Sequence, residues 1–409
     1  MAVLGSAAVV PLPCPPAPED SMQSTALVFC ALLGLQGPAP APAAAKPAPV
    51  SPTPPPRAEL VRAAVEQLLP LQEHGEWPYE GVYRVQGEIP VGYRVGGTSI
   101  VATALLKAAP EHEGARAAIR RGAAAVLELL DHPSMAPSSR DAYDVRVWGH
   151  AYALAFLCEL EAAGCLGPDD AAARQWRPKL VQVLAGEEIP GGGWNYANHR
   201  APASFVTAPV VQALLLARSQ GLEVPDGLFL RARRSLECAR HGDGAFVYSD
   251  GADEPDGLGM SGAVTASLAG SAGRSAACES TLWLLGGSSL DRLRGSALQF
   301  FDHWDDLAAR RGRPGTHEGP YGIAPYYFYY AHAHAAQAIE CLPEGARAPL
   351  RERMLQALLA TRAADGTWND RVFPRTRNYG TSMAILALLE EKATLPARWT
   401  ELQAPESGK

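Results

Sequence analysis

The feature that most constrains how this chain folds is an apolar segment that recurs six times. Each copy is rich in Ala, Gly, Ser and Thr, and successive copies begin 50 to 69 residues apart. That spacing leaves room for one helical hairpin and its connecting loop in every repeat. The six copies are Gly97–Leu106, Val147–Phe156, Phe205–Leu216, Met260–Leu268, Tyr329–Ile339 and Tyr379–Leu389.

More polar stretches with helical periodicity alternate with these copies. In the last of them Leu350, Met354 and Leu358 fall on one stripe, so a helix there has one dry face and one solvated face. The six recurring segments are instead apolar nearly all round and must be buried on several sides. The polar stretches are expected to begin near Arg57, Gly114, Asp170, Pro225, Ser289 and Glu344.

Two concentric rings of helices satisfy both patterns. We therefore predict an all-α fold, an (α/α)6 toroid of six helical hairpins over residues 57–395. Its inner ring would hold the Ala/Gly/Thr-rich helices and its outer ring the amphipathic ones. A charged content of only 19% suits that much burial. Residues 396–409 are expected to form a disordered tail.

A further repeat follows several of the polar stretches and pairs a glycine with an aromatic residue two positions later. Glycine supplies the left-handed turn that ends a helix, and the aromatic ring can then fold back as a wedge between adjacent hairpins. We interpret these residues as structural. The four pairs are Gly75 with Trp77, Gly192 with Trp194, Gly244 with Phe246, and Gly366 with Trp368.

The first 56 residues have the pattern of a signal region and a linker. Ala26–Leu35 is an apolar run of signal-peptide length, too short to span a bilayer, and Ala-x-Ala sites lie between Gly37 and Ala45. Pro38–Pro56 is rich in Pro and Ala and is expected to be an extended, disordered linker. We expect translation from Met22 and export to the periplasm or medium, with no transmembrane segment in the mature chain. Without a functional signal, the protein would be cytoplasmic.

The charge pattern argues against nucleic acid as a partner. The formal net charge is −7, and the basic runs Arg231–Arg234 and Arg310–Arg313 are isolated within mixed sequence. A nucleic-acid-binding surface needs clustered positive charge.

In the last repeat, Asp365-Gly-Thr-Trp368 is followed by Asn378-Tyr-Gly-Thr-Ser-Met-Ala-Ile-Leu. This pair of motifs resembles the prenyltransferase and squalene-cyclase repeat, including the Gln-Trp repeats of hopene cyclases. The resemblance extends over residues 57 to 392. It implies an α/α toroid whose central cavity, in those enzymes, holds an isoprenoid.

The catalytic signatures of that group are not present in the sequence. There is no Asp-x-Asp-Asp tetrad; the nearest approaches are Asp141–Asp144 and Asp302–Asp306, and neither has the spacing. No Asp-x-Cys pair exists for zinc and no Asp-Asp-x-x-Asp run exists for magnesium and diphosphate. Arg362 stands where the repeat glutamine would be. No metal or cofactor is therefore expected, and whether the chain is an enzyme stays open.

A dense run of tyrosine and histidine offers the first candidate residues. On helical spacing Tyr326, Tyr330 and His334 share one stripe, while Tyr329 and His332 share another. The two histidines point to nearly opposite sides of a helix and cannot share one metal. One of the stripes is expected to face the central cavity, or both pack as core.

Further candidates lie in or beside the loops that enter the inner helices, where they would gather at one rim of a toroid. Taken together they are expected to line the cavity. They are Tyr93, Asp141, Asp144, His150, Tyr196, His199 and Tyr379.

Two classes of function remain at this point. The first is a toroid without an intact catalytic signature that binds a protein partner or an apolar molecule in its cavity. The second is a divergent enzyme, either isoprenoid-processing or a glycan hydrolase or lyase, which needs paired carboxylates or a Tyr/His base. The residues that could supply the second class are Asp141, Asp144, Asp250, Asp253, Tyr329 and His332.

Overall fold

The fold is that of a computed structural model. The structure describes residues 55–139, 141, 143–166, 170–197, 201–249, 266–392 and 395–399. Contacts divide the chain into two units, Met1–Pro54 and Pro55–Lys409, and every described residue belongs to the second. The predicted signal region, the Met22 start and most of the linker therefore lie outside the described residues.

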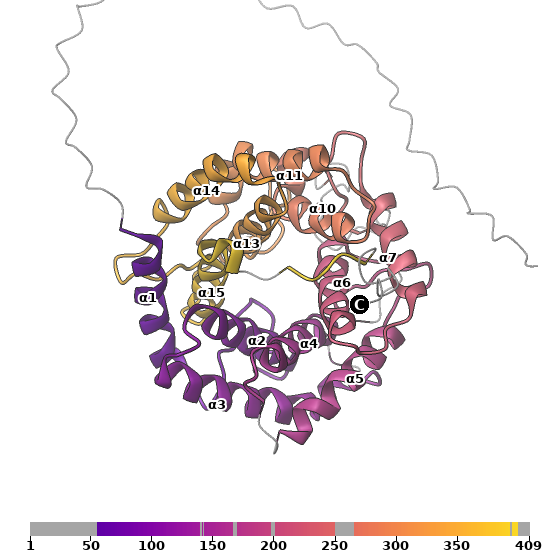
Figure 1. The fold of residues 1–409 in the computed structure, drawn as a ribbon, viewed down its shortest axis with the longest axis vertical. Coiled ribbons are helices and arrows are strands. Elements are labelled where there is room, and N and C mark those ends of the chain that lie inside the picture. Colours follow the sequence, from indigo (N-terminus) through magenta and orange to yellow (C-terminus); the bar gives the residue numbers. More distant parts are fainter. Residues whose placement is uncertain are drawn as a thin grey trace, which may run out of the picture. The chain divides into compact units, whose positions relative to one another are not determined.

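Helices within the second unit form two concentric rings (Figure 1). Each inner helix packs against the next, and the last returns to the first, which closes the ring. The inner helices are α2 (Val91–Ala108), α4 (Arg146–Ala162), α6 (Ser204–Ser219), α10 (Ser275–Leu284), α13 (Tyr327–Glu340) and α15 (Thr376–Leu388). The outer helices are α1 (Arg57–Leu68), α3 (Glu113–Leu130), α5 (Ala171–Gly186), α7 (Asp226–Ala239), α11 (Leu290–Asp302) and α14 (Glu344–Leu359). Shorter elements are η1 (Leu69–Leu71), η2 (Pro133–Met135), α9 (Leu268–Ser271), α12 (Trp304–Ala308) and η3 (Glu390–Lys392).

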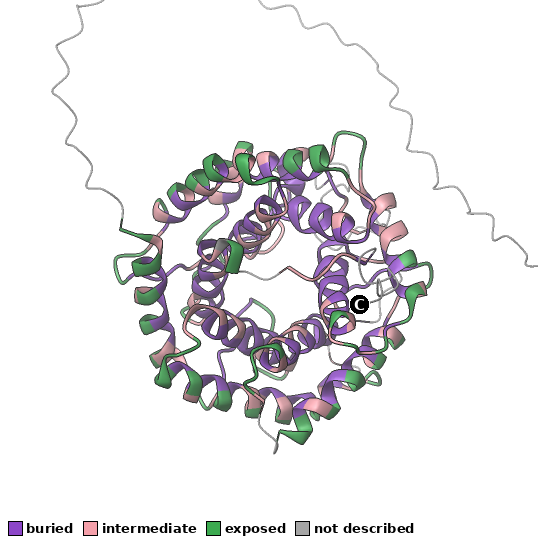
Figure 2. Ribbon diagram, in the orientation of Figure 1, coloured by how far each residue is buried: buried purple, intermediate pink, exposed green. Residues whose placement is uncertain are grey.

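The predicted all-α toroid is confirmed, and burial explains it. The inner helices are buried on almost every side, whereas each outer helix keeps an exposed outward face (Figure 2). On α14, Leu350, Met354 and Leu358 are buried, as their stripe predicts. All six outer helices begin within one residue of the expected position.

The fourth inner helix is the one element that the sequence pattern misplaced. We expected it at Met260–Leu268, of which residues 260–265 lie outside the described part of the chain; among the described helices, α10 at Ser275–Leu284 lies between α6 and α13. Two small-residue runs follow each other here, and Arg274 and Glu279 give the later run a polar character. Both charges are buried and paired: Arg274 donates to the Phe246 carbonyl, and Glu279 accepts from Arg240.

The aromatic residues of the glycine-aromatic repeat are buried wedges, but the tryptophans form hydrogen bonds within one hairpin and not between adjacent hairpins as predicted. Trp368 is fully buried; its indole Nε1 donates to the Leu358 carbonyl at the end of α14 (2.8 Å), and its backbone N–H donates to Thr381 Oγ1 on α15 (3.0 Å). Each wedge thus ties an outer helix to the inner helix of the same hairpin. The same pair of bonds joins Trp77 to Leu68 and Thr98, and Trp194 to Leu184 and Thr207.

Glycine is required at these turns for two reasons. Gly192 has a φ of 114°, and a Cβ built there would lie 2.4 Å from the Arg231 carbonyl oxygen. Gly366 has a φ of 88°. Side chains other than hydrogen are strained in that region of backbone space.

The chain after α15 corrects the predicted boundary of the tail. Residues 395–399 pack on the ring instead of beginning a disordered tail: Trp399 is buried against Phe229, and its Nε1 donates to Asp226 (3.3 Å). Arg398 lies over the Trp283 ring, 4.2 Å from its centroid. Residues 400–409 are outside the described part of the chain.

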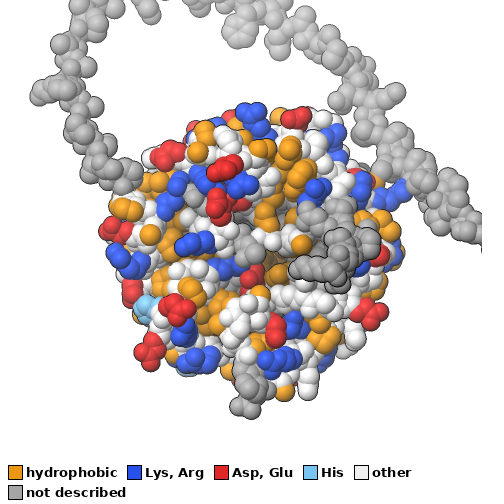
Figure 3. All heavy atoms as spheres, viewed as in Figure 1, with side chains coloured by type: hydrophobic (Ala, Val, Ile, Leu, Met, Phe, Trp, Pro, Cys, Tyr) orange, Lys and Arg blue, Asp and Glu red, His pale blue; other side chains and the backbone are white. Residues whose placement is uncertain are grey.

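Within the described residues, no helix has both the length and the hydropathy that crossing a membrane requires. The face seen down the ring axis carries acidic and basic side chains interspersed with one another (Figure 3).

Candidate functional site

The inside of the inner ring contains a cavity of about 160 Å³. Its lining comes from α2, α4, α6, α13 and α15, together with Pro396 from the C-terminal segment. Along α4 the lining runs from Ala151 to Glu159, which at 1.5 Å per residue makes the cavity about 12 Å deep. Most of the wall is apolar and includes Ile100, Ala155, Pro209, Ala213, Leu216 and Met383.

The small side chains of the inner helices are what leave this space open. Ala151, Ala155 and Ala213 stand where bulkier residues would fill the ring axis. The Ala-rich pattern that identifies the inner helices in the sequence therefore also sets the width of the cavity.

One wall of the cavity is polar and consists of linked side chains. Gln337 Nε2 donates to Gln212 Oε1 (3.0 Å), and Gln212 Nε2 donates to Thr281 Oγ1 (2.9 Å). At the other end His334 Nδ1 lies 3.0 Å from Gln337 Oε1. Burial lowers the pKa of His334 to about 4, and the bond to Gln337 only partly offsets this, so the ring is neutral near pH 7. The Tyr330 ring is tilted against the His334 ring, and their centroids lie 4.3 Å apart.

Three further polar side chains belong to the same lining. Lys107 of α2 and Glu159 of α4 form an ion pair (2.7 Å), so their charges balance in the wall. Tyr152 also lines the cavity; its hydroxyl is buried and lacks a hydrogen-bond partner among the described residues.

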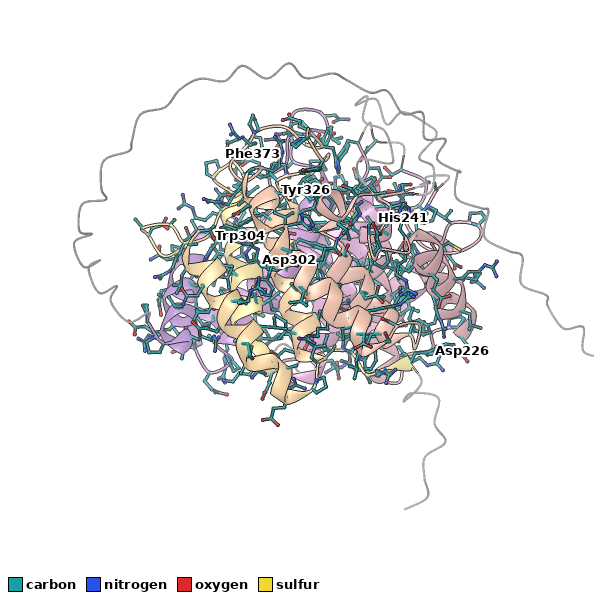
Figure 4. The ribbon with its side chains drawn as sticks, turned by 90° about the horizontal axis from the view of Figure 1, so that it is seen from above. Asp226, His241, Asp302, Trp304, Tyr326 and Phe373 are labelled. Carbon is teal, nitrogen blue, oxygen red and sulfur yellow. The ribbon has the colours of Figure 1, made fainter. Side chains whose placement is uncertain are left out.

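Aromatic side chains gather at the end of the ring where the inner helices begin. Figure 4 shows the ring side-on: Tyr326, beside the start of α13, lies toward one end, and Asp226, at the start of α7, toward the other. We call the end where the inner helices begin the N-terminal rim. There Tyr93 and Tyr143 share a hydrogen bond (2.8 Å), and burial raises the pKa of both hydroxyls.

The rim cluster extends around the axis. Tyr196 and Tyr326 have their hydroxyls 3.5 Å apart, and Tyr326 also contacts His317 Nε2 (2.9 Å). Tyr379 packs edge-on against Tyr79 with centroids 5.1 Å apart. These rings pack on one another at the N-terminal rim, an arrangement typical of aromatic core residues.

One acid at this rim stands out. Asp370 is fully buried, and neither carboxylate oxygen has a hydrogen-bond partner in the described part of the chain. Burial raises the pKa of Asp370 to about 7, and the positive charges of Arg371 and Arg311 oppose that rise. A carboxyl with this pKa exchanges a proton near neutral pH.

The structure separates the two predicted stripes of α13. His334 faces the cavity and Tyr330 packs beside it. Tyr329 and His332 face the outer ring: the Tyr329 hydroxyl donates to the Thr361 carbonyl (3.4 Å), and His332 accepts from Trp304 Nε1 (3.0 Å). His332 Nδ1 lies 2.7 Å from the Phe328 carbonyl, so both of its nitrogens are used and it is a core histidine.

The other predicted residues do not line this cavity. Asp144 is paired with Arg146 at the N-terminal rim, and Asp141 is half-buried nearby. His150 is buried, and burial lowers its pKa to about 3. His199 lies outside the described residues, as do Asp250 and Asp253. Of the predicted residues at the loops, Tyr93, Tyr196 and Tyr379 gather in the rim cluster.

Sequence reasoning missed most of the cavity residues. Gln212 and Gln337 sit inside two of the recurring apolar segments, where an amide is unusual, and that contrast is a signal that could have found them. Lys107 and Glu159 come from the last turns of their helices and read as ordinary solvated residues. Asp370 lies two residues after Trp368 in a loop, where an acidic side chain is ordinarily expected to be exposed.

Comparison with known proteins supports the fold but not a specific function. The sequence matches no known family model and no curated protein. Among solved structures, the chain resembles the GH76A α-1,6-mannanase from Salegentibacter, with a TM-score of 0.54 and 12% identity over 83% of this chain and 99% of the mannanase. It also resembles the Lin0763 protein from Listeria innocua, with a TM-score of 0.51 and 14% identity over 86% and 99%.

The type II terpene cyclase MstE from Scytonema aligns over 82% of this chain and 98% of its own, at 15% identity and a TM-score of 0.49. At identities this low, a shared fold does not imply a shared reaction, because one fold hosts many functions. The class of protein that fold and comparisons define is an α/α toroid.

Proposed function

We propose that this toroid binds a small apolar molecule in the cavity of its inner ring. The observation that carries the proposal is a cavity of about 160 Å³ with a mostly apolar wall and a few converging polar side chains. Ligand sites in proteins typically have this composition. A partner protein would instead need an exposed surface, and this cavity lies inside the ring.

The volume limits the size of the ligand. An apolar cavity of about 150 Å³ holds benzene, so this one suits a molecule about the size of a benzene ring with small substituents. A longer chain would have to pass the C-terminal segment at Pro396.

The test is calorimetric titration of the full chain with p-xylene, which has no hydrogen-bonding group. Ala155→Phe places a phenyl ring in the cavity and is expected to abolish binding. Ala172→Phe makes the same change on the exposed surface of α5 and is expected to leave binding unchanged. Wild-type protein that takes up no p-xylene, or Ala155→Phe that binds it equally well, would refute the proposal.

A carbohydrate-active enzyme is the second class considered, and its support is the toroid shared with the mannanase. Glycoside hydrolysis uses two carboxylates about 5–10 Å apart across an open cleft. In the cavity wall, Glu159 is the acid, and it is paired with Lys107. The cavity therefore favours an apolar ligand over a glycan.

The N-terminal pattern motivates a separate proposal of export. Expression from Met1 and from Met22, followed by cell fractionation, tests it. A cleaved product in the periplasm or medium is expected. An uncleaved cytoplasmic product from both starts would contradict export.

A further inference from the structure

The polar wall of the cavity is a chain of hydrogen bonds whose direction is set at one end. Thr281 Oγ1 lies 2.8 Å from the Ala277 carbonyl, which can only accept, so the hydroxyl hydrogen is directed there. The Thr281 oxygen is then the acceptor for Gln212 Nε2 (2.9 Å). This orients the Gln212 amide with its oxygen toward Gln337.

Each hydrogen-bond direction fixes the next one, as far as His334 in the cavity wall. Gln337 donates its Nε2 hydrogen to Gln212 Oε1 and therefore offers Oε1 to His334. An amide oxygen only accepts, so His334 Nδ1 carries the ring hydrogen. A neutral imidazole protonated at Nδ1 has a lone pair at Nε2.

That lone pair is unused. Within the described part of the chain His334 Nε2 has no hydrogen-bond partner, whereas both nitrogens of His332, two residues earlier, are satisfied. His334 and Tyr152 line the same cavity, and the Tyr152 hydroxyl also lacks a partner. A buried hydroxyl without a partner, such as that of Tyr152, lowers stability, and a ligand in the cavity that reaches both this hydroxyl and the accessible His334 Nε2 would supply the missing bonds.

We infer that the ligand is an apolar alcohol or phenol whose hydroxyl donates to His334 Nε2. This inference rests on the proposed function, because it identifies the chemical class that the cavity takes. A hydroxyl both donates and accepts, so its oxygen can receive the Tyr152 hydrogen as well. An alkene without a polar group would leave both residues unpaired.

The experiment uses two probes of nearly equal shape, 4-methylphenol and p-xylene, on the full chain and on His334→Phe. The replacement keeps a ring beside Tyr330 and removes the acceptor. Its affinity for 4-methylphenol is expected to fall about tenfold, the value of one neutral hydrogen bond, while that for p-xylene changes by less than about twofold.

The outcomes separate the two proposals. If His334→Phe weakens both probes equally, the hydroxyl is not received at His334, but the cavity still binds apolar molecules. If neither probe binds the wild-type chain, the cavity proposal fails and this inference fails with it.

A second measurement needs no variant and covers the case in which His334→Phe does not fold. In ring ¹⁵N spectra of wild-type protein, His334 Nε2 is expected to resonate as an unprotonated acceptor. Its signal is expected to shift upfield with 4-methylphenol and to stay in place with p-xylene. The His332 signals serve as the internal control and should not move. An Nε2 that already carries hydrogen would overturn the inference.

Discussion

Replacing Trp368 by phenylalanine and by alanine separates the contribution of its indole hydrogen bond to stability from that of its buried ring. Phenylalanine keeps most of the buried ring but loses the bond to the Leu358 carbonyl. That carbonyl still accepts from the Thr361 backbone N–H (3.2 Å), so it is not orphaned, and the loss is expected to be about 1 kcal/mol. Alanine also removes the fully buried ring and is expected to cost about 3–5 kcal/mol.

The assay is urea unfolding at equilibrium, followed by far-UV circular dichroism. Trp194→Phe is the matched variant, because its indole makes the equivalent bond to Leu184 (2.7 Å), and it should lose a similar amount. If Trp368→Phe costs as much as Trp368→Ala, the hydrogen bond, not ring burial, dominates. If Trp368→Ala costs less than about 1 kcal/mol, the wedge does not hold the hairpin together.

Three further predictions concern titration and the C-terminal segment. Burial raises the pKa of the Asp370 carboxyl to about 7 from its usual 3.8. Its contribution to stability is therefore present at pH 4 and lost as the pH rises through 7. Asp370→Asn should raise the melting temperature at pH 8 and not at pH 4. Burial lowers the pKa of His332 and His334 to about 4 and that of His150 to about 3, so stability should fall as the pH drops from 6.5 to 4, by up to about 3 kcal/mol per histidine. Urea unfolding of the Asp370→Asn variant at pH 7 and pH 4.5 checks this, because in the wild-type chain Asp370 acts in the opposite direction over the same range; equal stability of the variant at both would contradict it. Trp399→Ala should speed hydrogen exchange at residues 395–399 and leave α13 unchanged; exchange that is unchanged at both sites would show that Trp399 does not anchor the segment.

The toroid could be predicted because its two signals are local. Small residues recur at hairpin spacing, and the glycine-aromatic pairs mark where an outer helix ends. The fourth inner helix was misplaced because Arg274 and Glu279 are buried through partners far away in the sequence. A sequence pattern shows that these residues are charged, but not which distant residues pair with them.

The cavity could not be located from the sequence, because it depends on how each inner helix is rotated about its axis. Spacing placed His334 and His332 on different stripes correctly but did not decide which stripe faces inward. The candidates at the N-terminal rim are near one another as expected, and their aromatic rings pack against each other. The cavity is lined mainly by small and aliphatic side chains, such as Ala155 and Ala213, with Tyr152 among them.

The measurement that tests the central claim most directly is a crystal structure of the full chain soaked with 4-bromophenol, with anomalous data collected at the bromine edge. The account predicts a bromine peak inside the inner ring, among Ala155, Ala213 and Met383, with the phenol oxygen within hydrogen-bond distance of His334 Nε2. An inner ring without a bromine peak, or bromine bound only on the outer surface, would contradict it.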